Sequence, residues 1–380
     1  AEGGAPTPEG WRMNRTGVLL VTTELGLGGA ERVVADLAMG MDRERYRPAV
    51  AALNGRGPFA ARLREAGVPV WDLGVRGKRQ ALSGWRALSR LIADEKVRLV
   101  HAHLFHAEML SRLSTRGRVP VVGTLHIAEG RPMPWRFRLD RWTSRWCAVR
   151  TAVTRAAAGF HASALGIPVS DYAIIHNGID LDEYRPPVQR AAAKAALGFD
   201  PELPVVGALG RFDWQKGMDI FLEAAARLSA ARPAVQFLLG GWGREEAALR
   251  ERALQPDLAG RVRIVARPES PRALYSAMDL FVFPSRYEGF GLTLAEAMAC
   301  GCAVVASDLP STREVLQTEG GLAGVVVPVG AADALCEAVS ALVGNGAERE
   351  RLALSARARA LDFTPAAMIA GYESIYARFF

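Results

Sequence analysis

Two cations and two carboxylates in the second half of the chain could together hold a phosphorylated sugar. Arg211 follows the apolar run PVVGALG, and Lys216 comes five residues later. Cations fixed in this way bind a diphosphate through charge-assisted hydrogen bonds. Glu288 and Glu296 come after the apolar run LFVFPS. A carboxylate accepts hydrogen bonds from vicinal hydroxyls, so one of the two can hold a hexose and the other a ribose.

The turn EGFG and the stretch LTLAEAMA that follows it predict a helix N-terminus beside these carboxylates. Glycines let the backbone approach a ligand closely. The unpaired N–H groups at the start of a helix form an anion site. These groups belong to Phe290, Gly291, Leu292 and Thr293. With the two cations they make a diphosphate cradle for which we expect neither a metal nor a cofactor.

Each of these features alone has an ordinary explanation. An Arg and Lys pair on a loop is usually solvated, EGFG could be a plain strand-to-helix turn, and a carboxylate in a first helical turn is favoured by the helix dipole. The chain has only four Lys, however, so a Lys in this loop is unexpected. Because both loops follow strands of one predicted sheet, their joint position favours a binding site.

In the first half, the segment LGLGGAERV contains Gly28 and Gly29 and suggests a dinucleotide-binding loop. That interpretation requires an acidic residue about 20 positions later, at the end of the second strand. The second strand ends AALNG, without a carboxylate, so a nicotinamide enzyme is the weaker hypothesis. His101 and His103 share one face of an extended strand, but no Cys completes a tetrahedral metal site, and we expect buried or cleft-lining histidines instead.

The segment PWRFRLDRWTSRWCAVR stands out by its composition. Wound as a helix, it places Leu139 and three tryptophans in one stripe, which three arginines flank. These residues are Trp135, Trp142 and Trp146, and Arg138, Arg141 and Arg145. Such a helix can lie on an anionic bilayer or grip a diphosphate-linked lipid. The alternative, that the stripe packs into the domain and the arginines are only solvated, stays open.

The elements that must position these residues are short apolar runs separated by amphipathic stretches. We expect strands at GVLLVTT, PAVAAL, VPVW, RLVHAH, VPVVGTLH and AVRTAVT, and then at PVVGALG, VQFLLGG, RVRIVA, LFVFPS, CAVVAS and GVVVP. These runs are apolar on both faces, as in parallel strands that helices cover on each side. Repeated βαβ units of this kind predict an α/β protein built from doubly wound sheets.

The length of 380 residues suits two domains. A polar, proline-containing stretch near residues 180–203 marks their border, so we expect domains at 13–185 and 186–362. The last segment, 363–380, predicts a helix that docks back on the first domain through Tyr372, Ile375, Tyr376 and Phe379. Residues before Met13 are expected to be an unstructured leader.

Charge is distributed unevenly between the two halves. Residues 1–185 carry 27 Lys and Arg against 18 Asp and Glu, a net charge of +9, whereas residues 186–380 have a net charge of −2. The first half is therefore expected to meet an anionic partner, although it contains no nucleic-acid motif. No apolar run approaches the length of about 20 residues that spans a bilayer. The four cysteines lack CxxC spacing, as in reduced cytoplasmic proteins.

The stretches GRFDWQKG and FPSRYEGFGLTLAEAMACGCAVVAS resemble the signature of the retaining glycosyltransferases of family 4, which have the GT-B fold. Both glutamates of that family's E-x7-E pattern are present, as Glu288 and Glu296. GGAERVV, TLHI and HNGID extend the resemblance over nearly the whole chain. It implies two Rossmann-like domains that face each other across a cleft.

The resemblance also implies roles for individual residues. Arg211 and Lys216 would bind the donor diphosphate, and Glu296 would hold the ribose. Glu288 would face the transferred sugar, as would His126 at the end of the strand VVGTLH. Phe290, Gly291 and Leu292 would supply backbone contacts, and Gly28 and Gly29 would form a loop near the donor phosphates and the acceptor.

On this basis we expect a metal-independent hexosyltransferase that uses a nucleoside diphosphate sugar, with UDP favoured. Its acceptor would be a hydroxyl, for example of a lipid-linked saccharide in polysaccharide or envelope synthesis. We expect it in the cytoplasm or peripherally on the inner face of the cell membrane. A sugar-nucleotide epimerase or phosphorylase on the same fold, and a non-catalytic sugar-nucleotide-binding module, remain alternatives.

Overall fold

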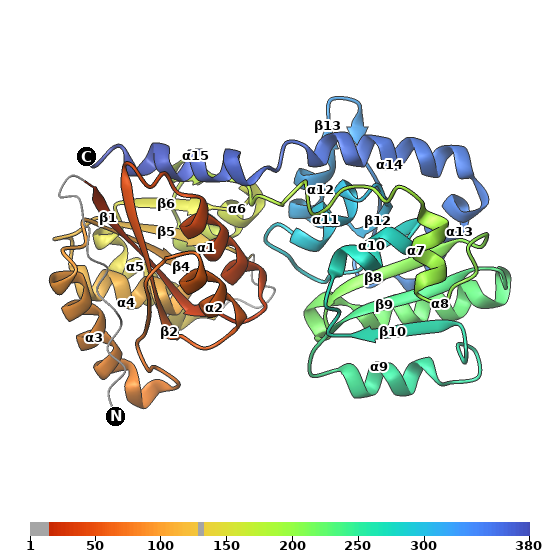
Figure 1. The fold of residues 1–380 in the computed structure, drawn as a ribbon, viewed down its shortest axis with the longest axis horizontal. Helices are drawn as coiled ribbons and strands as arrows, with labels where there is room; N and C mark the ends of the chain where they lie inside the picture. Colours follow the sequence, from red (N-terminus) through yellow and green to blue (C-terminus); the bar gives the residue numbers. More distant parts are fainter. Residues whose placement is uncertain (1–14, 128–132) are drawn as a thin grey trace. The chain divides into compact units, whose positions relative to one another are not determined.

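A computed structural model describes residues 15–127 and 133–380 (Figure 1). The chain divides into two compact units, each assembled from separate segments. Unit 1 comprises residues up to Thr124, Pro134–Thr151 and Ile369–Phe380. Unit 2 comprises Leu125–Met133 and Ala152–Met368. The domain limits at residues 185 and 362 that the sequence suggests stay a prediction.

The first sheet has seven strands in the order β3-β2-β1-β4-β5-β6-β7. Its pairs β1–β2, β1–β4, β2–β3 and β4–β5 are parallel. The strands are β1 (Thr16–Glu24), β2 (Tyr46–Asn54), β3 (Val70–Asp72), β4 (Leu99–His103), β5 (Val121–Leu125), β6 (Val149–Ala152) and β7 (Tyr172–Ile174). The six strands expected in the first half are therefore confirmed. The seventh, β7, was missed because its short run YAII merges directly into the polar stretch HNGID.

Helices connect these strands. They are α1 (Gly29–Gly40), α2 (Pro58–Glu65), α3 (Ala81–Asp94), α4 (Phe105–Thr115), α5 (Pro134–Thr143) and α6 (Arg155–Leu165), with short 3-10 turns η1 (Lys78–Gln80), η2 (Ser144–Trp146) and η3 (Val169–Asp171). Leu88 of α3 and Leu110 of α4 join a core cluster with Leu19 of β1 and Val100 of β4. Apolar strands buried on both faces explain the continuous apolar runs in the sequence.

The second sheet has six strands in the order β10-β9-β8-β11-β12-β15, and all neighbouring pairs in this order are parallel. These strands are β8 (Val205–Arg211), β9 (Gln236–Trp242), β10 (Val262–Ala266), β11 (Leu280–Phe283), β12 (Ala303–Ser307) and β15 (Val325–Val327). They coincide with the six runs expected in the second half. A separate hairpin pairs β13 (Gln317–Thr318) with β14 (Gly321–Leu322).

Helices cover both faces of the second sheet (Figure 1). They are α7 (Arg190–Ala196), α8 (Met218–Ala231), α9 (Glu246–Ala253), α10 (Pro271–Ala277), α11 (Leu292–Ala299), α12 (Pro310–Leu316), α13 (Ala332–Gly344) and α14 (Gly346–Ala360), with the 3-10 turn η4 (Trp214–Lys216). Alternate residues of β11 point into different cores. Phe281 packs with α11, whereas Val282 packs with α8. The fold is a doubly wound α/β architecture with two parallel sheets, as the sequence predicts.

The last helix, α15 (Pro365–Tyr376), docks back on unit 1. The hydroxyl of Tyr376 and Nδ1 of His101 share a hydrogen bond of 2.6 Å. The hydroxyls of Thr124 and Tyr372 lie 3.5 Å apart. Tyr372, Ile375 and Tyr376 are buried, as expected. Phe379 lies beyond the end of the helix, so its assignment to the same helical face was wrong.

No helix among residues 15–127 and 133–380 is long and apolar enough to cross a membrane.

Candidate functional site

The candidate site of unit 2 lies where the order of its sheet reverses. From β8, the chain adds β9 and β10 on one side and β11, β12 and β15 on the other. The loops after β8 and β11 therefore diverge from neighbouring strands at their carboxyl ends, which is the place where doubly wound sheets bind ligands. These are the two loops that contain the cations and carboxylates singled out in the sequence.

The loop after β8 presents Arg211 and Lys216. Arg211 is the last residue of β8, is about half exposed, and donates a 3.0 Å hydrogen bond to the side-chain oxygen of Gln215. Lys216 ends the turn η4 and is largely buried. Gly217 follows with φ +65°, and a Cβ atom there would lie 2.1 Å from the carbonyl oxygen of Pro284. Only glycine fits this close approach between the two loops.

The loop after β11 places Glu288 against Lys216. The two side chains form an ion pair, and both are largely buried. Ser285 also donates a 3.1 Å hydrogen bond to the Glu288 carboxylate. Ser285 was not singled out in the sequence, although its position three residues before Glu288 in FPSRYEG was a usable signal.

Further contacts tie the two loops together. The side-chain amide of Gln215 donates to the carbonyl of Tyr287 at 3.1 Å, and the backbone N–H of Arg286 donates to the carbonyl of Gln215 at 2.7 Å. Arg286 is bidentate to Asp219 at 2.9 and 2.6 Å and lies 4.8 Å from the ring centre of Trp214. The cations and carboxylates are thus held on cross-linked loops.

Helix α11 begins at this point, with Gly291 as its N-cap in the left-handed conformation at φ +86°. Its first N–H groups have no partner within the helix, because the partners would lie before its start. The hydroxyl oxygen of Thr293 is buried and has no hydrogen-bond partner among the described residues. The helix start expected near residues 290–293 is therefore present, whereas its binding of an anion stays a prediction.

Glu296 lies one turn into α11 and is buried. Tyr275 of α10 donates a 2.9 Å hydrogen bond to its carboxylate. Burial and the Glu296 carboxylate raise the pKa of Tyr275 well above its ordinary value, so the phenol keeps its proton and remains a donor. Sequence analysis did not find Tyr275, because it is 21 residues from Glu296 and on another helix.

His126 follows β5 and belongs to unit 2. Its carbonyl oxygen lies so close to Gly289 that a Cβ atom there would be 1.9 Å away. The carbonyl of Gly289 also accepts a 2.7 Å hydrogen bond from Thr154. Desolvation by the surrounding protein lowers the pKa of His126 to about 4, so the imidazole is neutral at pH 7.

The glycines singled out in unit 1 open helix α1. Gly28 is its N-cap and Gly29 its first residue. Glu31, buried in the first turn, folds back so closely that a Cβ atom on Gly28 would lie 2.0 Å from its carboxylate oxygen. A larger residue at position 28 would therefore require the Glu31 side chain to move.

The Trp/Arg segment is a shorter helix than expected. Helix α5 ends at Thr143, and residues 144–146 form the turn η2, so one continuous helical stripe through Trp146 was wrong. Trp135 and Trp142 remain 53% and 51% exposed. Trp146 lies edge-on to Trp142, with ring centres 5.4 Å apart.

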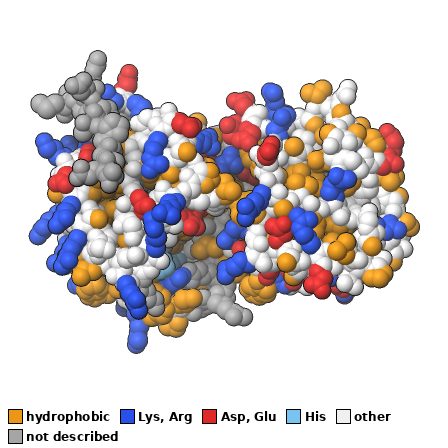
Figure 2. Space-filling model, turned by 60° about the horizontal axis from the view of Figure 1, so that its bottom comes forward, with side chains coloured by type: hydrophobic (Ala, Val, Ile, Leu, Met, Phe, Trp, Pro, Cys, Tyr) orange, Lys and Arg blue, Asp and Glu red, His pale blue; other side chains and the backbone are white. Residues whose placement is uncertain are grey.

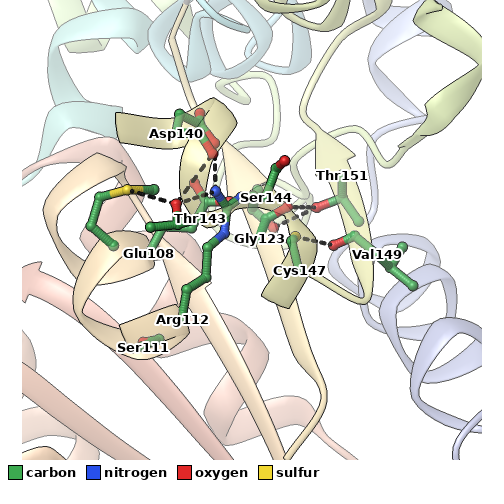
Figure 3. Close-up of polar contacts among 12 residues, drawn as sticks. Glu108, Ser111, Arg112, Gly123, Asp140, Thr143, Ser144, Cys147, Val149 and Thr151 are labelled. Carbon is green, nitrogen blue, oxygen red and sulfur yellow. Dashed lines mark hydrogen bonds and ion pairs between the residues drawn. The ribbon is translucent and has the colours of Figure 1, made fainter. Parts of the chain in front are cut away.

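Helix α5 is held by its polar face instead. Buried Arg112 of α4 lies between Glu108 and Asp140 and forms an ion pair with each (Figure 3). Burial lowers the pKa of Arg112, but the combined effect of Glu108, Cys147 and Asp140 is larger and raises it. The net pKa lies above the ordinary value, so the guanidinium stays charged. Because Asp140 and Thr143 are the buried residues of α5, this cluster leaves Trp135, Trp142, Arg138 and Arg141 on the outward side.

His101 and His103 are both fully buried in β4, as expected for core histidines. Nε2 of His101 lies 2.7 Å from the hydroxyl of Thr124. Among the described residues, no group of three or more His, Cys, Asp or Glu side chains could hold a metal ion. Asp180 and Asp182 form an Asp-x-Asp pair, a spacing that can bind a metal ion. The Asp180 carboxylate instead accepts hydrogen bonds from the backbone N–H groups of Asp182 and Glu183 and so caps a turn.

Two family models match the chain, one in each half. Residues 27–183 match the model described as Glycosyltransferase Family 4. Residues 203–345 match the model described as Glycosyl transferases group 1.

Curated relatives are about one-third identical to the chain. The lipopolysaccharide core biosynthesis mannosyltransferase LpsB of Rhizobium meliloti is 32% identical over 61% of this chain and 68% of its own. The phosphatidyl-myo-inositol mannosyltransferase of Mycolicibacterium smegmatis is 35% identical over 67% and 64%. The alpha-maltose-1-phosphate synthase of Mycobacterium tuberculosis is 31% identical over 73% and 79%.

Solved structures share the fold over almost the whole chain. Anabaena HepE, in complex with UDP, superposes with a TM-score of 0.84 over 96% of this chain and 100% of its own at 22% identity. The sucrose-phosphate synthase of Thermosynechococcus elongatus gives a TM-score of 0.80 over 96% and 99% at 21% identity.

Proposed function

Because the chain belongs to the glycosyltransferases of family 4 and has the GT-B fold, we propose that it is a retaining hexosyltransferase that uses a nucleoside diphosphate sugar. One observation carries the proposal: the loops after β8 and β11 gather two cations, two carboxylates and a helix N-terminus at the switch point of the second sheet. UDP is the favoured nucleotide. This choice rests on HepE, which was solved with UDP and with UDP-glucose. The names of two relatives describe mannosyltransferases, which supports a hexose as the transferred sugar.

In this proposal Arg211, Lys216 and the N-terminus of α11 hold the donor diphosphate. Lys216 is ion-paired with Glu288. A diphosphate would share the ammonium with that carboxylate, so donor binding would also set the position of Glu288 beside the sugar. Positive charge placed at the leaving group stabilises the negative charge that builds on it in the transition state.

The two glutamates would hold the two sugars of the donor. Glu296 would accept hydrogen bonds from the ribose hydroxyls, and the Tyr275 hydroxyl fixes the orientation of its carboxylate. Glu288 and the neutral imidazole of His126 would face the transferred hexose, with Phe290, Gly291 and Leu292 contributing backbone groups. Gly28 and Gly29 would contribute from unit 1.

Retention would follow from attack of the acceptor hydroxyl on the face from which the diphosphate departs. The acceptor oxygen forms the new bond to the anomeric carbon as the bond to the diphosphate oxygen breaks. The departing phosphate oxygen takes the acceptor proton. No carboxylate nucleophile is required, which suits a site whose two glutamates bind hydroxyls.

We further propose a lipid-linked saccharide as acceptor and association of α5 with an anionic membrane surface. Two relatives have names that refer to lipopolysaccharide core synthesis and to phosphatidyl-myo-inositol. The outward tryptophans of α5, with exposed Arg138 and Arg141, suit an interfacial helix. Reversing the charge of both arginines should abolish cosedimentation with anionic vesicles at low salt, and intact binding would contradict this assignment.

The experiment that tests the transferase is a donor screen followed by product analysis. A rise in melting temperature with UDP, and release of UDP from a UDP-sugar only when acceptor is present, is expected. The product should keep the donor's anomeric configuration by NMR. Release without acceptor, conversion of the donor to an epimer, or binding without turnover would each support one of the alternatives instead.

A further inference from the structure

A second candidate site lies in unit 1, at the opposite ends of the strands from His103 and the other carboxyl-end residues. A cavity of about 610 Å³ opens where the chain enters β4, β5 and β6. It is lined in part by Arg98, which precedes β4, by Arg118, which precedes β5, and by Arg145 of η2. Ligands of doubly wound sheets bind at the carboxyl ends, so this cavity is separate from the place expected for donor or acceptor.

Three arginine side chains give the cavity a positive lining. No Asp or Glu belongs to its described lining. Within residues 15–127 and 133–380, the guanidinium groups of Arg98, Arg118 and Arg145 form no hydrogen bond or ion pair with another residue, unlike the many arginines of this chain that are salt-bridged. Bringing like charges around one concave space costs free energy, which a bound anion would remove.

Two of the three arginines are already oriented by aromatic rings. The guanidinium carbon of Arg98 lies 4.7 Å from the ring centre of Phe380, and that of Arg145 lies 4.8 Å from Trp146. Stacking occupies the flat face of a guanidinium and leaves its N–H groups available in the plane. Those groups match two oxygens of a phosphate, which is why arginine is favoured at phosphate sites.

The rest of the lining is apolar. Val97, Val119 and Pro120 contribute aliphatic surface, and Phe379 and Trp146 contribute rings. Figure 2 also shows many Lys and Arg side chains on the surface of unit 1. The helix dipole favours cations after the C-termini of α3 and α4, but it does not account for three unpaired guanidiniums that share one aromatic cavity.

We propose that this cavity binds a phosphate group that carries an apolar substituent. The phosphate oxygens meet the arginine N–H groups, and the substituent lies against Trp146 and Phe379. The group comes either from a small phosphate ester or from the headgroup of a membrane phospholipid. The proposal does not depend on transferase activity.

The first test measures the melting temperature with inorganic phosphate and with phenyl phosphate at constant ionic strength. Phenyl phosphate is expected to saturate, to raise the melting temperature by about 2–4 °C, and to bind several-fold more tightly than inorganic phosphate because its ring meets the apolar wall. Equal, non-saturating effects of the two anions would overturn the proposal.

Variants locate the binding. Arg98→Ala with Arg118→Ala should remove the stabilisation by phenyl phosphate. The matched control, Arg64→Ala with Arg79→Ala, removes two exposed arginines of the same unit that lie outside the cavity lining, and should leave it unchanged. Equal loss in both double variants would mean diffuse attraction, and loss in Lys216→Ala alone would place the phosphate in unit 2. Either result rejects the cavity.

Vesicles distinguish the two sources of the phosphate. If the source is a lipid, the Arg98→Ala, Arg118→Ala variant should cosediment several-fold less with phosphatidylglycerol vesicles than the control variant does, and neither should bind phosphatidylcholine. If the source is a small ester, only the soluble probe should separate the variants. If neither probe separates them, the cavity does not bind phosphate.

Discussion

At the scale of single residues, the site of unit 2 depends on a few charged side chains that neighbouring groups hold in place. Lys216 touches Glu288, Ser285 touches the same carboxylate, and Tyr275 touches Glu296. The types of the charged residues were readable from the sequence because their chemistry is specific. The supporting partner Tyr275 was not, because it is distant in sequence and its contact with Glu296 forms only in the folded chain.

Removing one cation of the cradle should reduce turnover. Lys216→Ala and Arg211→Ala are each expected to lower kcat by about 100-fold, because a charged contact to a developing anion contributes a few kcal/mol. The control is Arg250→Ala, which removes an exposed arginine of α9 and should keep full activity. Steady-state kinetics with the donor measure this effect, and melting curves check that the fold is intact. A wild-type kcat in both variants would contradict the binding of the donor diphosphate by Arg211 and Lys216.

His126 makes stability fall with acidity. Its pKa is about 4 in the folded protein and about 6.5 when unfolded, so between these values the unfolded state binds a proton that the folded state does not. The free energy of unfolding should therefore decrease as the pH falls from 6.5 towards 4. Urea unfolding of wild type and His126→Asn at pH 7 and 4.5 measures this, and the variant should lose less stability. Parallel losses would show that His126 is not desolvated.

At the scale of elements, the loops after β8 and β11 are locked together by a backbone contact. Gly217→Ala would place a methyl group 2.1 Å from the carbonyl oxygen of Pro284 and should abolish UDP binding. Gly260→Ala is the matched control, since Gly260 has φ +75° but nothing within 4 Å. The Gly260→Ala variant should lose only about 1–2 kcal/mol of stability, because alanine is strained in the left-handed conformation, and it should still bind UDP. Isothermal titration with UDP separates the two cases, and equal affinities would contradict the assignment of this contact.

Helix α15 is fixed on unit 1 by buried hydroxyls. Tyr376→Phe leaves Nδ1 of His101 without its 2.6 Å partner and should lower the free energy of unfolding by about 1–3 kcal/mol. Tyr372→Phe removes a hydroxyl that lies 3.5 Å from Thr124 and also interacts with Thr151, and it should cost less. Urea denaturation compares them. The reverse order, or no change in either, would mean that α15 is held by apolar packing alone.

The parallel sheets were predictable to the level of individual strands, because runs such as LFVFPS and CAVVAS are apolar on both faces. The strand Tyr172–Ile174 and the end of α5 at Thr143 were not. The run YAII of that strand is short and merges into the polar stretch HNGID. Helix α5 packs through Asp140 on Arg112, a polar contact that no pattern of tryptophans signals.

At the scale of the whole molecule, the charge needed by a diphosphate is supplied by the protein itself. Arg211, Lys216 and the N-terminus of α11 lie on neighbouring loops, so a divalent cation would be redundant there. We expect full transfer activity in excess EDTA and no gain from added Mn²⁺ or Mg²⁺. If the enzyme loses activity in chelator and regains it with either ion, the diphosphate is not bound by the protein's own charges alone.

Unit 1 is completed by a segment, Ile369–Phe380, that comes after all of unit 2 in the chain. A ribosome therefore makes the whole of unit 2 before the residues that cover His101 and Thr124 exist. The nascent chain holds this face of the first sheet uncovered for most of translation. The part of the protein that is synthesised first is thus the part that finishes folding last, and its exposed strands depend on protection from other chains during that interval.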